Sequence, residues 1–227
     1  MKTRLIVLRH GNTFNPGDVI LRVGSRTDLP LTERGREQAR EAARRLKQRR
    51  IMPHRYVVAP LIRTTQTADT FIDVFPIPEP LSFYAFLTEL DYGEDDGRPE
   101  TEVVLDVGRA EAERAGLALS DDELTALGKE ALSIWDKDAV LPTRWRFLQE
   151  RIDELPNQWR QFADKLLECY PGENTLVVTS NGVARFSTAI LPPNAPRPDS
   201  LKLATGKFGI YEYDSPSAGW RLTEWNV

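Results

Sequence analysis

A histidine and an arginine stand together just past the first apolar run of the chain. Residues 4–8, "RLIVL", predict a short buried strand, and Arg9, His10 and Gly11 follow it directly. A neutral imidazole can act as a nucleophile. A guanidinium presents two parallel donors to a phosphate or a carboxylate, and a glycine allows close approach to the backbone. A histidine at a strand end also serves structural purposes, so the tripeptide needs support from the rest of the chain.

A second arginine gives part of that support. The segment "LIRTTQTADTFIDVF" (residues 61–75) predicts a helix, and Arg63 lies in its first turn. A helix N-terminus attracts anions through its free N–H groups and its dipole. Arg63 would add a second forked donor at such a place, although a solvated arginine on a helix surface explains the same pattern.

The stretch "VVTSNGVARF" (residues 177–186) repeats the pattern of the first strand end. An apolar strand predicted at 174–180 runs into Ser180-Asn181-Gly182, as the first runs into Arg9-His10-Gly11. The amide of Asn181 can donate hydrogen bonds but carries no charge. Asparagine is also among the best N-cap residues, so Asn181 could cap the helix that follows.

The elements that must position these residues alternate along the chain. Strands are predicted at 4–8, 55–59 and 174–180, and helices at 31–50, 61–75 and 182–191. A loop is predicted at 81–99 and mainly helical structure at about 100–168. The chain is predicted to end in a hairpin over 206–227, with its turn near Ser215 and Gly219. This order predicts an α/β chain: three α/β/α layers, a mostly parallel sheet and right-handed crossovers. We expect a single domain, 1–227, whose ligand site lies at the carboxyl ends of the strands.

Capping residues mark two of the helix starts. Thr32 is suited to cap the helix at 31–50, with Glu33 near the positive end of its dipole. Ser120 and Glu123 have the spacing of a capping box. Both patterns predict where a helix begins.

Composition narrows the class of protein. The chain has 227 residues, of which 41% are hydrophobic, and a net charge of −4. That length supports an ample core, and the mild acidity argues against a general nucleic-acid binder. Cys169 is the single cysteine, so a reducing compartment is expected. No apolar run approaches the ~18 residues of a membrane span, which makes the cytoplasm the expected location.

The composition gives no sign of a metal or an organic cofactor. The two histidines and the cysteine lie far apart, without ligand spacing. His54 has no motif around it and is expected at the surface. No phosphate-binding P-loop or dinucleotide glycine fingerprint occurs.

These motifs together resemble the histidine phosphatase superfamily, the phosphoglycerate mutase-like proteins. The resemblance rests on "LRHGNTFN", "RVGSRTDLPLTERGREQA", "APLIRTTQTA", "LTELDYGEDDG" and "GENTLVVTSNGVAR". It is strong over residues 4–97, returns over 172–190, and is weak over 100–168 and the tail. Two positions depart from the family pattern: Ala59 stands where serine is usual, and Asn181 where a second histidine is usual.

The resemblance implies a role for each matching residue. His10 would take up a phosphoryl group, Arg9 and Arg63 would hold its oxygens, and Glu89 would donate a proton to the leaving alcohol. Asp91 competes with Glu89 for that role. The remaining contacts to the phosphate would come from Thr13, Asn15, Asn181 and Gly182, although Thr13 and Asn15 also suit turns.

Three functions follow as alternatives. The first is hydrolysis of a small phosphorylated metabolite, with that substrate or inorganic phosphate as the partner and a homodimer as one compatible assembly. The second is mutase-type phosphotransfer, for which residues 100–123 offer only Arg109 and Arg114 as bases, and residues 142–147 could add Arg144 or Arg146. The third is a phosphate-binding or interaction protein impaired by Asn181, whether natural or engineered. An exposed patch of Trp135, Trp145 and Trp159 would favour the interaction protein.

Overall fold

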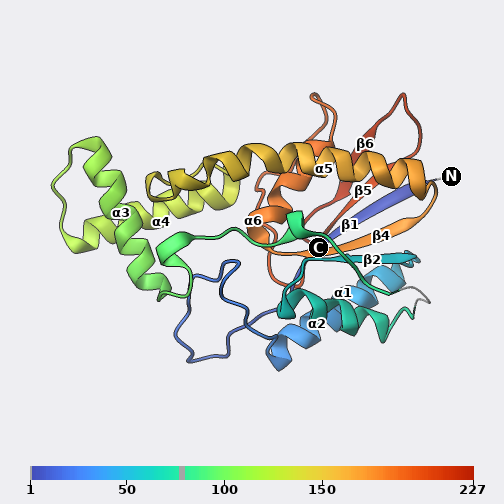
Figure 1. Ribbon diagram of the computed structural model, residues 1–227, viewed down its shortest axis with the longest axis horizontal. Helices are drawn as coiled ribbons and strands as arrows, with labels where there is room; N and C mark the ends of the chain where they lie inside the picture. The colour runs from blue at the N-terminus through green and yellow to red at the C-terminus, as the bar shows by residue number, and fades with distance from the viewer. Residues whose placement is uncertain (1, 77–79) are drawn as a thin grey trace.

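The computed structural model describes residues 2–76 and 80–227, and a single mixed sheet lies at its centre (Figure 1). The strands follow the order β3-β2-β4-β1-β5-β6 across the sheet. Their bounds are β1 Thr3–Arg9, β2 Arg55–Val58, β3 Ser82–Phe83, β4 Asn174–Thr179, β5 Phe208–Tyr213 and β6 Trp220–Glu224. The three strands predicted from apolar runs therefore form, each within a residue or two of its expected bounds.

Strand direction divides the sheet into two parts. β1, β2, β3 and β4 run parallel to one another, whereas β5 is antiparallel to both β1 and β6. The predicted C-terminal hairpin is confirmed, and the backbone N–H groups of Ala218 and Gly219 donate to the carbonyl of Ser215 at its turn. The mostly parallel α/β architecture is also confirmed.

Two helices, α1 Glu33–Gln48 and α2 Ile62–Ile72, cover one face of the sheet (Figure 1). An apolar stripe of α1 is fully buried there, in one cluster with Ile6 and Leu8 of β1. The stripe consists of Ala39, Ala42, Ala43 and Leu46. Small side chains on this stripe let the helix lie close to the strands. The helices α1 and α2 therefore pack tightly against the sheet near the carboxyl end of β1.

The other face is covered by α5 Gln149–Cys169, with α6 Asn181–Ala184 beside it (Figure 1). Trp159 and Phe162 of α5 share one core cluster with Leu5 and Val7 of β1. Long as α5 is, neither it nor any other helix in the described part of the chain is both long and apolar enough to cross a bilayer.

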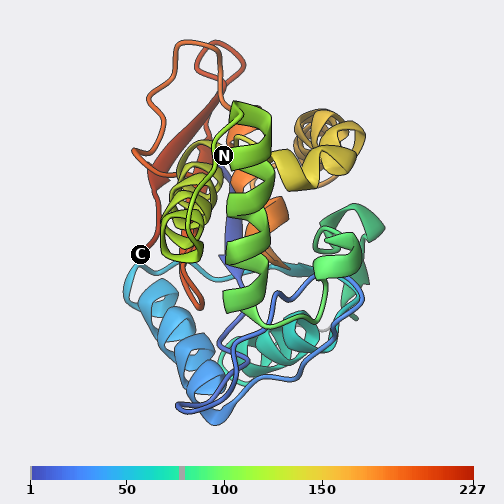
Figure 2. The ribbon, with the colours of Figure 1, turned by 90° about the vertical axis from the view of Figure 1, so that its left-hand side faces the viewer.

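The insertion begins with α3 Glu100–Ala115 and α4 Asp121–Asp138, which pack side by side at one end of the sheet (Figures 1 and 2). A short 3₁₀ segment, Thr143–Leu148, then leads into α5. The two helices approach closely at Gly108, where an added Cβ would lie 1.9 Å from the carbonyl oxygen of Leu124. The insertion stands at the carboxyl ends of the parallel strands, where a ligand site is expected.

The capping predictions are confirmed. The Thr32 hydroxyl accepts from the Gly35 N–H at 3.1 Å, and the Glu123 carboxylate accepts from the Ser120 N–H at 2.9 Å. The tryptophans at 135, 145 and 159 are buried and form no exposed patch.

Two predicted segments differ from the structure. The loop at 81–99 contains β3 and two 3₁₀ turns, Ala85–Leu87 and Gly93–Asp95, because its backbone pairs with the free edge of β2. The helix at 182–191 is α-helical only in its first turn. Residues Arg185–Ile190 form a 3₁₀ segment, in which the Thr188 hydroxyl donates to the Arg185 carbonyl and competes with α-helical pairing.

Candidate active site

A polar cavity of about 320 Å³ opens at the carboxyl ends of β1 and β4. Six of the residues predicted from the sequence line it: Arg9, His10, Thr13, Glu89, Asn181 and Gly182. Arg63 and Asn15 are not among the lining residues. The cavity thus brings together side chains from both ends of the chain.

His10 continues the ladder at the end of β1. Its backbone N–H donates to the carbonyl of Thr179 at 3.1 Å, and the side chain is only 7% exposed. The imidazole Nδ1 lies 2.7 Å from the carbonyl oxygen of Gly11. Since a carbonyl oxygen only accepts, Nδ1 carries the hydrogen of the neutral ring, and Nε2 keeps its lone pair.

The surroundings of His10 favour that neutral form. Burial lowers the pKa of His10 well below its usual 6.5, and the positive charges of Arg63 and Arg9 lower it further. The ring is therefore uncharged at neutral pH, which is the state a nucleophilic imidazole requires.

Arg9 and Arg63 place two guanidinium groups near this ring. Arg63 is completely buried and donates to the carbonyls of Thr27 at 3.0 Å and Gly24 at 3.1 Å. Arg9 donates to the carbonyl of Leu203 at 2.9 Å. The Nε atoms of both arginines are buried and have no partner among the described residues. Buried donors without acceptors are costly, and anionic oxygens would satisfy them.

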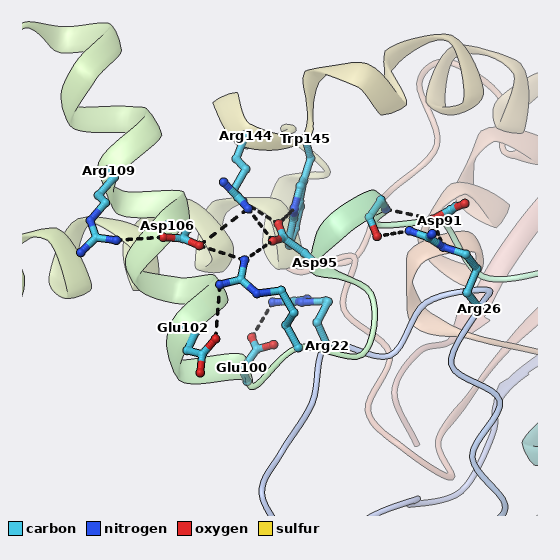
Figure 3. Close-up of polar contacts among 12 residues, drawn as sticks. Arg22, Arg26, Asp91, Asp95, Glu100, Glu102, Asp106, Arg109, Arg144 and Trp145 are labelled. Carbon is cyan, nitrogen blue, oxygen red and sulfur yellow. Dashed lines mark hydrogen bonds and ion pairs between the residues drawn. The ribbon is translucent and has the colours of Figure 1, made fainter.

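Glu89 lies on the cavity wall with both carboxylate oxygens held by backbone groups. Oε2 accepts from the Gly182 N–H at 3.1 Å, and Oε1 accepts from the Leu90 N–H at 2.8 Å. Asp91 lies outside the cavity, half exposed, in an ion pair with Arg26 at 2.9 Å (Figure 3). Of the two candidate acids, Glu89 alone faces the same space as His10.

Both polar atoms of the Asn181 side chain have a partner within the protein. Its Oδ1 accepts from the Leu203 N–H at 2.8 Å, and its Nδ2 donates to Asp136 at 3.2 Å. Asn181 is the first residue of α6, and Ser180 occupies the N-cap position. The expectation that Asn181 caps this helix is therefore wrong, because β4 ends one residue earlier than predicted.

Asn15 and His54 are not among the residues that line the cavity. Asn15 is exposed in a turn, where its N–H donates to Asp18 and its carbonyl accepts from the Asp18 N–H. Its contact with a phosphate stays a prediction, as does that of Thr13. His54 is exposed as expected, and its Nδ1 accepts from the Asn174 N–H at 2.8 Å.

The cavity is also lined by charged residues outside the set of sequence candidates, here called the outer region: Arg22, Glu100, Asp136, Arg185 and Lys202. Arg185 is buried against the ring of Trp135, 4.0 Å from its centroid, and donates to Asp136 at 3.1 Å. Lys202 forms an ion pair with the same carboxylate at 2.7 Å. Arg185 belongs to the matched motif "GENTLVVTSNGVAR", whereas Asp136 and Lys202 come from segments without a recognisable pattern.

Arg22 is a further member of this group of lining residues. It stacks on the ring of Trp145, 4.7 Å from the centroid, and donates to Glu100 of α3 at 2.5 Å (Figure 3). The basic residues suggested for a mutase behave differently, since Arg109, Arg114, Arg144 and Arg146 do not line this cavity. Arg144, for example, donates to the carboxylate of Asp95 at 2.7 Å.

Comparison with known families gives one match. A family model described as histidine phosphatase superfamily (branch 1) matches residues 5–116, the part that carries His10, Arg63 and Glu89. No match was found among curated protein sequences.

Several solved structures share the fold over nearly the whole chain. The mycobacterial glucosyl-3-phosphoglycerate phosphatase in complex with VO3 is 22% identical, with a TM-score of 0.66 over 99% of this chain and 98% of that one. Phosphoglycerate mutase from Bacillus anthracis is 20% identical, with a TM-score of 0.68 over 99% and 93%. Phosphoserine phosphatase from Entamoeba histolytica, in complex with 3-phosphoglyceric acid, is 17% identical, with a TM-score of 0.64 over 99% and 97%. The phosphoglycerate mutase-like fold is confirmed.

Proposed function

We propose that this chain, which belongs to the histidine phosphatase superfamily, hydrolyses a phosphomonoester of a small metabolite through a phosphohistidine on His10. The observation that carries the proposal is the state of His10. Its ring is buried and neutral, its Nε2 is free of the Gly11 contact, and two guanidinium groups with unsatisfied buried donors lie near it.

In the first step Nε2 of His10 attacks phosphorus, and the bond between phosphorus and the leaving oxygen breaks. Arg9 and Arg63 neutralise the charge on the equatorial oxygens, which is the main need of phosphoryl transfer. Glu89 in its protonated form gives its proton to the leaving oxygen, so that an alcohol and not an alkoxide departs.

In the second step water attacks the phosphohistidine. Glu89, now a carboxylate, takes a proton from that water as the oxygen bonds to phosphorus. The phosphorus–Nε2 bond breaks, and His10 returns to its neutral form with inorganic phosphate released. The backbone N–H groups of Gly182 and Leu90 keep the Glu89 carboxylate facing the same space in both steps.

The outer region of the cavity supports a small polar substrate. Arg22, Arg185 and Lys202 supply cations there, and Glu100 and Asp136 balance them. Two of the structural relatives are named for phosphoglycerates and one for phosphoserine. We extend this chemistry to the present chain as a phosphorylated metabolite that carries further polar groups, the carboxylate among them.

We favour hydrolysis over mutase-type transfer. The basic residues that the insertion was expected to supply for a mutase, Arg109, Arg114, Arg144 and Arg146, lie outside the cavity, and three of them form ion pairs with Asp106, Glu111 and Asp95. A purely phosphate-binding role would not require the acid, and Glu89 is held in place by two backbone donors. We therefore infer turnover, with no metal required because the arginines supply the positive charge.

The wider assignments follow from the same observations. We propose that residues 1–227 form one domain, with the helical insertion at about 100–168 shaping the substrate cavity. We place the protein in the cytoplasm, since the single cysteine fits a reducing compartment. A homodimer stays a prediction, and the mild acidity disfavours nucleic acid as a partner.

The test is direct. The protein is incubated with a panel of phosphorylated metabolites, and phosphate release is measured beside interconversion of 2- and 3-phosphoglycerate. A brief reaction with a labelled substrate, quenched in base, is expected to leave acid-labile phosphate on His10, and His10→Ala should abolish both label and release. Absence of label and of release across the panel would refute the proposal. Interconversion faster than release would instead establish the mutase.

A further inference from the structure

The register between β1 and β4 shows which residue of the second strand end lies beside His10. Arg9 pairs with Thr179 in the parallel ladder, and the His10 N–H donates to the Thr179 carbonyl at 3.1 Å. His10 is therefore level with Ser180. The similarity between "RHG" and "SNG" in the sequence would instead set His10 beside Asn181, one position later. A difference of one residue reverses the face to which a strand side chain points.

The two core clusters confirm the assignment of faces. Ile6 and Leu8 of β1 pack with Val178 of β4 on the side of α1 and α2, so the alternation carries His10 and Ser180 to that side. Odd-numbered residues of the two strands, such as Leu5, Val7 and Val177, face the opposite side. Arg9 at the end of β1 donates to the Leu203 carbonyl, and Asn181, which lies beyond β4 in α6, accepts from the Leu203 N–H.

Ser180 is held next to the guanidinium of Arg63. Its Oγ accepts from Nη2 of Arg63 at 3.4 Å, which is the long limit of a hydrogen bond. The hydroxyl is 1% exposed, it makes no capping bond to α6, and in the described part of the chain Oγ acts only as an acceptor. A buried hydroxyl with an unused hydrogen lies beside an arginine with an unused Nε donor.

We propose that Ser180, and not Asn181, is the polar side chain that contacts the transferring phosphoryl group. This inference rests on the proposed function of the site. The Ser180 hydroxyl donates its hydrogen to a phosphoryl oxygen. The weak hydrogen bond between Ser180 and Arg63 is then replaced by hydrogen bonds from both side chains to the phosphoryl group. Both groups lie on the face of the strands to which His10 points, so they can bind oxygens of a phosphoryl group on its ring.

Asn181 then has a positioning role. Its side chain joins the Leu203 N–H to Asp136, and the Leu203 carbonyl in turn accepts from Arg9. The amide thus ties the segment around Leu203 to the wall of the cavity and holds the partner of Arg9. It acts through Arg9 and not by direct contact with the phosphoryl group.

Vanadate binding separates these roles, because vanadate occupies a phosphoryl site without requiring turnover. For Ser180→Ala we expect vanadate affinity and kcat to fall by about 10²-fold, the low end of what removal of one preorganised donor costs. Ser180→Thr, which keeps a hydroxyl, should retain more of both. Asn181→Ala should weaken vanadate binding less than Ser180→Ala does. Ser187→Ala is the matched control, because Ser187 is a buried serine bonded to Tyr211 outside the cavity.

Each outcome decides the question. Wild-type affinity in Ser180→Ala, or a larger loss in Asn181→Ala, would overturn the assignment. If Ser180→Ala does not fold, the nearly isosteric Ser180→Cys replaces it, since a thiol is a weak donor. Wild-type protein that binds vanadate but releases no phosphate would refute hydrolysis and leave the Ser180 assignment open to the same binding test. Wild-type protein that binds neither vanadate nor phosphate would refute both proposals.

Discussion

The backbone N–H of Gly182 donates to Oε2 of Glu89 at 3.1 Å, and nothing larger than a hydrogen fits on the Gly182 Cα. An added Cβ would lie 2.0 Å from Oε1 of the same carboxylate. The turn between β4 and α6 thus both binds the proposed acid and sets the space that it occupies.

Gly182→Ala should therefore displace Glu89 and lower kcat by at least about 10²-fold, the low end of what a general acid contributes. The proposed first step slows because its proton donor moves away from the leaving oxygen. Phosphate release at saturating substrate measures the effect, and the free energy of unfolding shows whether the fold survives. Unchanged kcat in a folded variant would exclude Glu89 as the acid.

Glu89→Gln should discriminate between leaving groups. The variant cannot donate a proton, so alkyl phosphates should slow by about 10²–10⁴-fold. p-Nitrophenyl phosphate should slow much less, since its phenolate leaves without protonation. Asp91→Asn is the control and should behave as wild type, because Asp91 lies outside the cavity and pairs with Arg26. Equal losses on both substrates would instead indicate a structural role for Glu89.

His10 should make the protein sensitive to acid. Burial and the charges of Arg63 and Arg9 lower the pKa of His10 in the folded state. Below about pH 6.5 the unfolded chain binds a proton that the folded chain does not, so stability falls as pH falls. The loss is up to about 1.4 kcal/mol per pH unit until the folded pKa is reached.

Urea unfolding at pH 7.5 and pH 5.5 measures this dependence, and His10→Gln should reduce it. The acid limb of phosphohistidine formation should lie below pH 6.5 in the wild type. Arg63→Met should move that limb toward neutrality, because it removes one of the positive charges. An acid limb at or above pH 6.5 in the wild type would show that the ring is not held neutral.

Asp95 should matter for stability and not for chemistry. It is 2% exposed, with bonds from Arg144 at 2.7 Å and from the Trp145 indole at 2.9 Å (Figure 3). Burial alone would raise the pKa of Asp95, but these donors together bring it below the ordinary value. The carboxylate therefore contributes stability that is lost as pH falls through its folded pKa.

Asp95→Ala leaves the buried Trp145 donor unsatisfied, and we expect a loss of about 1–3 kcal/mol or more in the free energy of unfolding. Vanadate affinity in the folded protein should change little. Asp91→Asn, exposed in the same loop, should lose less than about 0.5 kcal/mol. Equal stability of the two variants would contradict the role assigned to Asp95.

Local patterns were enough to predict much of the fold. Short β-branched runs gave β1, β2 and β4, because such side chains suit a pleated, buried surface. Thr32 and the Ser120–Glu123 pair marked helix starts, since capping acts within one turn and needs no tertiary partner. Tertiary pairing decided what these rules missed, as in β3, which forms on the edge of β2.

Residue types and their places after strands also indicated the proposed nucleophile and arginines, whereas the acid Glu89 was implied by the family resemblance. Arg9, His10 and Glu89 meet in one cavity because each follows a strand or a loop that ends at the same edge of the sheet. The charged outer region depended on the insertion: Asp136 lies on α4 and Lys202 far beyond α5, and no spacing in the sequence relates them.

The sequence alone determined that two strand ends, at "RHG" and "SNG", belong to one site. Only the tertiary structure decided which residues of the two ends lie level. Pairing of Arg9 with Thr179 sets Ser180, and not Asn181, level with His10. The physical reason is that strand side chains alternate with a period of two, whereas the register depends on hydrogen bonds between segments about 170 residues apart.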